Sequence, residues 1–253
     1  MSFWVPLRDS IHRYFASPFL TLISLLQFFI FGTGLFLSIV SEYFCYLHTQ
    51  KLPPEHDITS RALPDMELIW TAAYGSLEFP KFPSGKGGAS VMVQNSTPKS
   101  CGTVRLTRAG ANDIKVDPIV DPNYLSAKED WDVYRRGLVF AREIGAEMGR
   151  SGYAIEEADV PASNSIEDLD AHIRRSAYTG QHLLSSCRMK PLGEGGVVDR
   201  ELKVYGIEGL RVADGSVVPS MVASRPQATV VMIAERCADF IRQEWKEKGL
   251  FME

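Results

Sequence analysis

The spacing of apolar residues predicts two long amphipathic helices and a shorter one. Over residues 128–148, apolar side chains recur every three or four positions and charged side chains occupy the other face. The same pattern runs from Gln227 to about Glu244, where Ser224 is placed to cap the helix and Pro226 suits its first turn. Residues 166–176 are predicted to form the shorter helix.

Extended segments are predicted before and between these helices. Residues 64–70 alternate like a strand, and residues 89–94 and 102–107 are apolar runs separated by the turn-forming N-S-T-P-K-S, which predicts a long hairpin or two paired strands. Nearer the C-terminus, residues 197–205 read as a bend followed by a strand. Residues 209–214 read as a short buried strand that ends in a polar turn.

The uncharged stretch from Phe19 to Val40 leaves two structures open. Its length suits a membrane-spanning helix or a signal anchor, with Arg8 and Arg13 preceding it. Gly32-Thr33-Gly34 in its middle suits instead a tight turn between two shorter apolar segments, both buried against the rest of the protein. The pattern alone favours neither.

Composition narrows the class of protein. The chain has 253 residues, 45% hydrophobic and 23% charged, with a formal net charge of -4 and no basic cluster, so no nucleic-acid partner is expected. Its four cysteines lie far apart and form no C-x-x-C, which excludes a zinc cluster, thioredoxin-type chemistry and a disulfide framework. No metal site is expected.

Three motifs in the C-terminal third occur in a characteristic order and spacing. They are H-L-L-S-S-C-R-M (182–189), G-G-V-V-D-R-E-L-K-V-Y-G-I-E-G-L-R-V-A-D-G-S-V-V-P (195–219) and R-P-Q-A-T-V-V-M-I-A-E-R-C-A-D-F-I (225–241). Together they closely resemble the C-terminal region of the glucose–methanol–choline (GMC) flavoprotein oxidoreductases. Agreement in order and distance over three motifs is far beyond what chance produces.

Upstream segments resemble the same family more loosely. T-P-K-S-C-G-T-V-R-L (97–106) is similar to a strand pair of the family, D-P-N-Y-L-S (121–126) to a loop before a long helix, and F-G-T-G-L (31–35) to a turn in the substrate domain. The last similarity implies that residues 19–40 belong to the protein interior and makes a membrane partner unlikely. No G-x-G-x-x-G followed by a helix is present, and residues 85–88 read as a loop.

The resemblance implies a truncated family member that begins just before the substrate domain. It implies an α+β fold, an antiparallel sheet with flanking helices, and a C-terminal strand and helix belonging to an incomplete FAD-binding α/β domain. Residues 1–205 would form the substrate-binding domain and residues 206–253 the C-terminal segment of the FAD domain. FAD is the cofactor expected for the complete protein, and we expect this chain alone not to retain it.

The resemblance also implies a reaction and its residues. Family members oxidise a CH–OH group, passing hydride to FAD while a histidine takes the hydroxyl proton, so a small-molecule alcohol is the expected partner. His182 occupies that histidine position, which suits an imidazole at neutral pH. The second active-site position, His or Asn in the family, is Arg225 here.

Arg225 leaves alternatives open. As a permanently charged donor it could stabilise an alkoxide, hold a substrate carboxylate, or pair with a surface acid. It is also compatible with a non-catalytic remnant or a non-redox, cyclase-like member. The resemblance places Asp214 and Gly215 on the phosphate–ribose side of the flavin, and Gln227, Ala228 and Thr229 at its ring, where a helix N-terminus favours negative charge.

Overall fold

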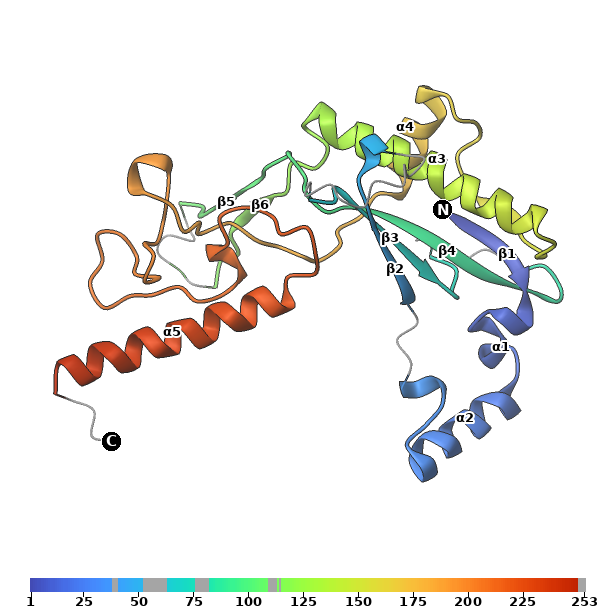
Figure 1. The fold of residues 1–253 in the computed structure, drawn as a ribbon, viewed down its shortest axis with the longest axis horizontal. Coiled ribbons are helices and arrows are strands. Elements are labelled where there is room, and N and C mark those ends of the chain that lie inside the picture. The colour runs from blue at the N-terminus through green and yellow to red at the C-terminus, as the bar shows by residue number, and fades with distance from the viewer. Residues whose placement is uncertain (38–40, 52–62, 76–81, 109–112, 114, 250–253) are drawn as a thin grey trace. The chain divides into compact units, whose positions relative to one another are not determined.

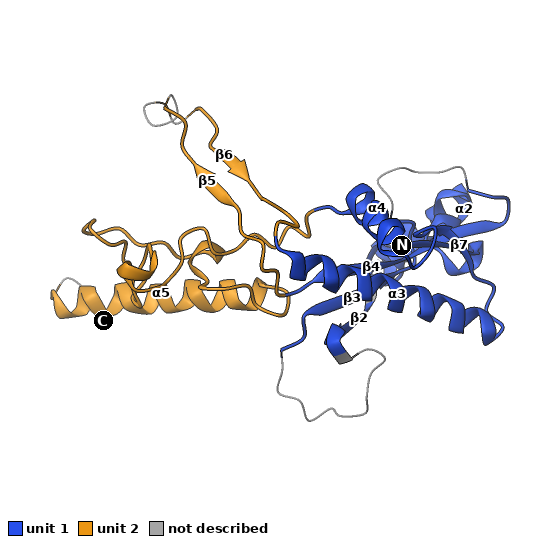
Figure 2. Cartoon of the chain, turned by 90° about the horizontal axis from the view of Figure 1, so that it is seen from above, with its two compact units in different colours: residues 1–96, 127–178 blue, residues 97–126, 179–253 orange. Residues whose placement is uncertain are grey.

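The computed structural model describes residues 1–37, 41–51, 63–75, 82–108, 113 and 115–249. They form two compact units (Figure 2): unit 1 is Met1–Ser96 with Ala127–Tyr178, and unit 2 is Thr97–Ser126 with Thr179–Glu253. The predicted boundary after residue 205 concerns the domains of a complete flavoprotein and stays a prediction.

Unit 1 is built on a five-stranded antiparallel sheet, in the order β2-β3-β4-β1-β7 (Figure 1). Its strands are β1 (Ser2–Pro6), β2 (Ser41–Leu47), β3 (Met66–Thr71), β4 (Lys86–Asn95) and β7 (Glu156–Asp159). The strands predicted over residues 64–70 and 89–94 are confirmed as β3 and β4, which pair with each other along the whole of β3. The antiparallel sheet expected for the α+β fold is therefore present.

Two predictions that concern the strands are wrong, one of a loop and one of a strand pairing. The loop predicted over residues 85–88 is mostly the start of β4, where Gly87 and Gly88 approach neighbouring segments so closely that an added Cβ would meet the Cβ of Ser10 at 2.3 Å or of Tyr74 at 2.5 Å. The predicted pairing across N-S-T-P-K-S does not form either. Instead β5 (Thr103–Arg105) pairs with β6 (Ile119–Asp121) as a separate two-stranded ribbon in unit 2.

Helix α3 (Lys128–Arg150) lies against the sheet and buries its apolar face there, as its pattern predicts (Figure 1). The core formed between them consists of Phe3, Met66, Leu68, Val91 and Ala141. Helix α4 (Ile166–Ser176) packs beside α3 and is capped by the hydroxyl of Ser165, which accepts a hydrogen bond from the amide of Asp168. The sheet is thus fixed by a helical layer that shares one core with it.

The closest approach of α3 to the sheet depends on Gly137. A Cβ at this position would lie 2.5 Å from both Met66 Sδ and Val93 Cγ1. We expect Gly137→Ala to lower the free energy of unfolding by about 1–3 kcal/mol through overpacking, measured by urea denaturation. Gly149→Ala in the same helix is the matched control, because its Cβ would meet only Ile155 Cγ2 at 3.7 Å. That variant should be neutral or stabilised; equal losses in both would contradict the packing explanation.

His172 on α4 is 2% exposed, and burial lowers its pKa from 6.5 to about 4. Arg175 Nη2 lies 3.0 Å from His172 Nδ1 and donates to Asp159, which suits a neutral imidazole. Because the unfolded chain protonates this histidine more readily, acidification from pH 6.5 to 4 should cost up to about 3 kcal/mol of stability. Unfolding curves measured across this pH range should show that loss. In His172→Gln the free energy of unfolding should change less with pH, because the buried imidazole is absent. An unchanged slope would contradict it.

The apolar stretch near the N-terminus forms two short segments joined by a turn, as one of the two alternatives predicts. After η1 (Leu7–Asp9) and α1 (His12–Phe15), helix α2 (Pro18–Phe31) ends at Gly32, whose left-handed backbone (φ 59°) turns the chain into η2 (Leu35–Leu37). The predicted burial is wrong, because most side chains of α2 are exposed. Among the described helices, none combines the length and the hydrophobicity needed to cross a membrane.

Unit 2 holds its core largely with turns. The buried side chains are Val198, Leu202, Val217, Val218, Ile233 and Cys237. The strands predicted over residues 197–205 and 209–214 are wrong: the structure has only isolated bridges there, including Val198 with Val204. Each segment contains a left-handed residue, Leu202 in the first and Gly209 at the start of the second. The predicted turn at Asp199 is confirmed, since its carboxylate accepts from the amides of residues 201 and 203.

The remaining elements of unit 2 are two short 3-10 helices and one long helix. They are η4 (Leu192–Glu194), η5 (Gly215–Val217) and α5 (Gln227–Glu247). Helix α5 confirms the C-terminal amphipathic prediction, with Ile233 and Cys237 buried on one face.

Candidate functional site

The loop that carries His182 is fixed to η5 by backbone hydrogen bonds. The amide of Ser185 donates to Gly215 O at 3.2 Å, that of Cys187 to Ser216 O at 2.8 Å, and that of Met189 to Val217 O at 2.8 Å. These bonds hold a half-buried His182 next to the turn that precedes α5 in unit 2.

The residues flanking His182 position it further. Gln181 adopts a left-handed backbone (φ 59°), uncommon for a residue other than glycine, and its amide donates to Thr179 Oγ1 at 3.0 Å. Such strained residues concentrate at functional sites. Leu184 packs against the unit 2 core, where a Cβ on Gly215 would lie 2.8 Å from Leu184 Cδ2. Glycine at 215 therefore lets this loop come close.

Helix α5 begins beside this loop without a side-chain cap. Its N-cap residue is Pro226, whose side chain makes no capping hydrogen bond. The predicted cap by Ser224 is wrong, because the helix starts later than that residue requires. An uncapped N-terminus of a helix this long offers amide N–H groups and the positive end of the helix dipole to a ligand.

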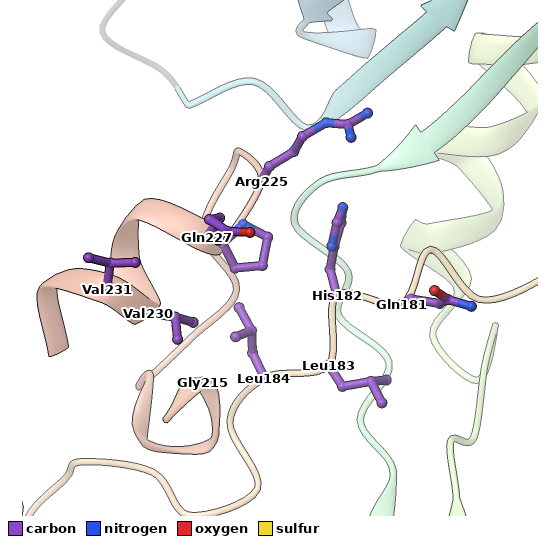
Figure 3. Close-up of a pocket in the computed structure, with 10 residues that line it drawn as sticks. Gln181, His182, Leu183, Leu184, Gly215, Arg225, Gln227, Val230 and Val231 are labelled. Atoms are coloured by element: carbon purple, nitrogen blue, oxygen red, sulfur yellow. The ribbon is translucent and has the colours of Figure 1, made fainter. Parts of the chain in front are cut away.

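The loop and the helix start line an open cavity of about 440 Å³ within unit 2 (Figure 3). Ten residues line it: Gln181, His182, Leu183, Leu184, Gly215, Arg225, Pro226, Gln227, Val230 and Val231. Figure 3 shows the side chains of His182 and Arg225 rising from two different segments toward the same side. The cavity thus brings together a proton acceptor, a permanent cation and a helix N-terminus.

Four of the seven predicted site residues line this cavity, and three do not. His182, Arg225, Gly215 and Gln227 are among the lining residues. Ala228 and Thr229 follow in the first turn of α5 but are not.

Asp214 is exposed and outside the cavity lining. Its Oδ1 accepts from the amide of Ser216 at 2.8 Å and caps η5. Hydrogen bonds from Ser216 lower the pKa of this carboxyl, so it carries a negative charge at neutral pH. Its observed contact is local, and a role toward a cofactor stays a prediction.

Sequence reasoning did not single out the apolar part of the cavity. Leu183 and Leu184 lie in the quoted histidine motif, and Val230 and Val231 lie one turn into α5, but none of them was predicted as a site residue. Helical spacing could have identified Val230 and Val231, because residues three and four positions after Gln227 lie on the same face of the helix. Cys187, predicted to be a small buried residue, is half-buried.

The part of the chain that contains this site matches a known protein family. The family model for GMC oxidoreductases matches residues 98–234, which include every residue lining the cavity. The chain belongs to the GMC oxidoreductase family. The resemblance noted in the sequence is confirmed, over more than half of the chain.

Individual GMC relatives cover most of the chain. Choline oxidase of Arthrobacter globiformis is 36% identical over 67% of this chain and 32% of its own length. Mitochondrial choline dehydrogenase of Homo sapiens is 30% identical over 78% of this chain and 32% of its own. The chain therefore spans about a third of the length of these relatives.

The fold agrees with a solved GMC flavoprotein structure. The structure of Aspergillus oryzae formate oxidase, a protein in which modification of FAD has been studied, superposes with a TM-score of 0.80. The match covers 99% of this chain and 46% of that one, at 24% identity. This likeness supports the predicted fold, an antiparallel sheet with helices.

Proposed function

We propose that this chain supplies the substrate side and the proton acceptor of an FAD-dependent oxidoreductase acting on CH–OH groups of small-molecule alcohols. The observation that carries the proposal is one cavity lined by His182, Arg225 and the start of α5. Family membership supports it, as do the names of the choline-oxidising relatives. Residues 1–205 would bind substrate, and residues 206–253 would belong to the FAD domain.

His182 would accept the hydroxyl proton of the alcohol. A neutral imidazole can take up a proton at neutral pH, and the loop's bonds to η5 fix the position from which it does so. The side chains of Leu184 and Val230 give the cavity an apolar wall beside these polar groups.

Arg225 would stabilise negative charge on the substrate oxygen as the proton leaves. A guanidinium has five N–H donors, so it can serve a substrate oxygen alongside other acceptors. Because it keeps its charge and cannot accept a proton, it would not share proton transfer with His182. The same donors would hold a substrate carboxylate in bidentate fashion.

The residues present fit a flavin beside this cavity. The first turn of α5, Gln227 to Thr229, would face the flavin ring and favour negative charge near it, and Gly215 lines the same cavity. Asp214 would lie toward the phosphate–ribose side. FAD, when bound, supplies the acceptor for the hydride.

Helix α5 has a second apolar stripe, which supports the proposal that a further part of an FAD domain packs against this helix. Val231, Ala234, Ala238, Ile241 and Trp245 recur at spacings of three and four. Val231, Ile241 and Trp245 are exposed, while the neighbouring stripe packs into the unit 2 core. A helix with two apolar stripes is typical of one packed between two layers. We expect this chain alone not to retain FAD.

Flavin content tests the proposal. The chain would be purified alone and as a chimera with the N-terminal part of choline oxidase that it does not match. The chimera should hold FAD at about one per chain and show flavin reduction by an alcohol, whereas the chain alone should hold far less. Stoichiometric flavin in the chain alone would refute the predicted dependence on a further part. A flavin-loaded chimera that no alcohol reduces would favour a non-redox, cyclase-like member.

A further inference from the structure

The one residue that helix α2 buries is polar, whereas most of its apolar residues are exposed, as is the polar Gln27. Ser24 is 3% exposed, whereas Phe19, Phe29 and Phe31 are 69%, 77% and 72% exposed. The half-buried positions include Thr21, whose hydroxyl donates to the backbone carbonyl of Ser17 at 3.3 Å. This arrangement reverses that of a helix whose outer face meets water. The exposed face of α2 is therefore predominantly apolar.

The α2 hairpin, residues 12–37, contacts the sheet at its base, where α1 packs against β4. Among the described elements its main helix packs against α1 and η2 (Figure 1). Near Gly32 the rings of Phe28, Phe29 and Phe36 contact one another, with centroids 5.2 and 6.3 Å from that of Phe28. No charged residue occurs in the sequence between Arg13 and Glu42. The hairpin ends in an exposed aromatic cluster.

We propose that the α2 hairpin inserts into one leaflet of a lipid membrane and docks unit 1 on that surface. Its 14-residue helix is about 21 Å long, shorter than the roughly 30 Å hydrocarbon core, so it enters without crossing. Exposed apolar side chains occupy most of the helix circumference. A flat protein patch would cover one side of it, whereas acyl chains can surround it.

The base of the hairpin has side chains suited to the headgroup region. Arg8 is exposed, and the guanidinium of Arg13 lies 4.5 Å from the ring centroid of Tyr14 and donates to its hydroxyl. Basic and tyrosine side chains are favoured at the boundary between lipid and water. Asp9 is the acidic side chain in this segment, and it lies within reach of Arg8. Insertion is driven mainly by apolar area, so neutral lipid suffices.

Vesicle sedimentation tests the proposal with the full chain and phosphatidylcholine vesicles. The double variant Phe29→Glu, Phe31→Glu places charges in the part that inserts. It should reduce the vesicle-bound fraction at least tenfold. Ile166→Glu is the matched control: Ile166 is an exposed apolar residue at the start of α4 in the same unit, where an acidic side chain suits the helix N-terminus. The control should bind vesicles like the unmodified chain.

If the α2 hairpin binds something other than lipid, the experiment gives a different result. No vesicle binding by the unmodified chain, or equal binding by the double variant, would overturn the proposal. Self-association that the double variant abolishes, without vesicle binding, would assign the hairpin to a second copy and also overturn it. Circular dichroism and thermal unfolding establish that each variant is folded. The outcome is independent of flavin content, so it is separable from the proposed oxidoreductase function.

Discussion

Replacing His182 by alanine in the flavin-loaded chimera is expected to lower turnover by a factor of about 10² to 10⁴, the range that general base catalysis supplies. The cause is loss of the acceptor for the hydroxyl proton at a position fixed by the bonds to η5. Steady-state kinetics with a reducing alcohol measures the loss. Flavin content should stay near that of the unmodified chimera, because the helix N-terminus and Gly215 remain.

Added imidazole distinguishes proton transfer from a structural role of His182. A free imidazole that enters the cavity left by His182→Ala should restore part of the turnover. Exchange of His12 for glutamine is the control, because His12 lies in unit 1 and hydrogen-bonds Ser10. Unchanged turnover in His182→Ala would show that this chain keeps the motif without its chemistry.

Replacing Arg225 by glutamine is expected to lower kcat by about 10² to 10³, the cost of removing a donor to a developing negative oxygen. Arg225→Lys should recover part of kcat by restoring the charge, but not the bidentate geometry. An alcohol that also carries a carboxylate should show an added rise in KM, because the guanidinium would hold that group too.

Arg236→Gln provides the matched control for Arg225. Arg236 lies on helix α5, which Arg225 precedes; it is exposed and stacks on Phe240 at 4.5 Å outside the cavity. Its exchange should leave kcat and KM unchanged. If Arg225→Gln behaved in the same way, Arg225 would have no role in the reaction, and a pairing with an acidic side chain would explain its presence.

The helices of the fold could be predicted because their apolar pattern matches their burial. Helix α3 presents one apolar face to one sheet, and residues 166–176 form α4 with the predicted bounds. Helix α5 extends three residues beyond its predicted end, where fraying and local contacts decide the boundary.

Several other features depend on contacts that local pattern does not show. The apolar residues at 197–205 and 209–214 serve a core held by turns, because left-handed residues such as Leu202 prevent a continuous ladder. The pairing of β4 with β1 and β3 is long-range and overrides the local turn at residues 95–100. The family resemblance implied burial for residues 19–40, yet most side chains of α2 are exposed, because exposure depends on what surrounds a helix.

The site was predicted in part, through a family motif. Motif spacing placed His182, Arg225 and Gln227 together, and the structure has all three in one cavity lining. The motif gave no information on which side chains close the cavity, since Leu184 and Val230 are apolar residues like many others. Asp214 has a turn-capping contact that its position in a motif could not distinguish from a ligand contact.

The central claim is that His182 and the start of α5 share one pocket that takes a flavin ring and an alcohol. A crystal structure of the FAD-loaded chimera with an alcohol or an unreactive analogue tests it most directly. The account predicts the flavin ring against the first turn of α5, with the substrate oxygen within hydrogen-bond distance of the His182 imidazole. A flavin ring or a substrate oxygen found away from both His182 and Gln227 would contradict it.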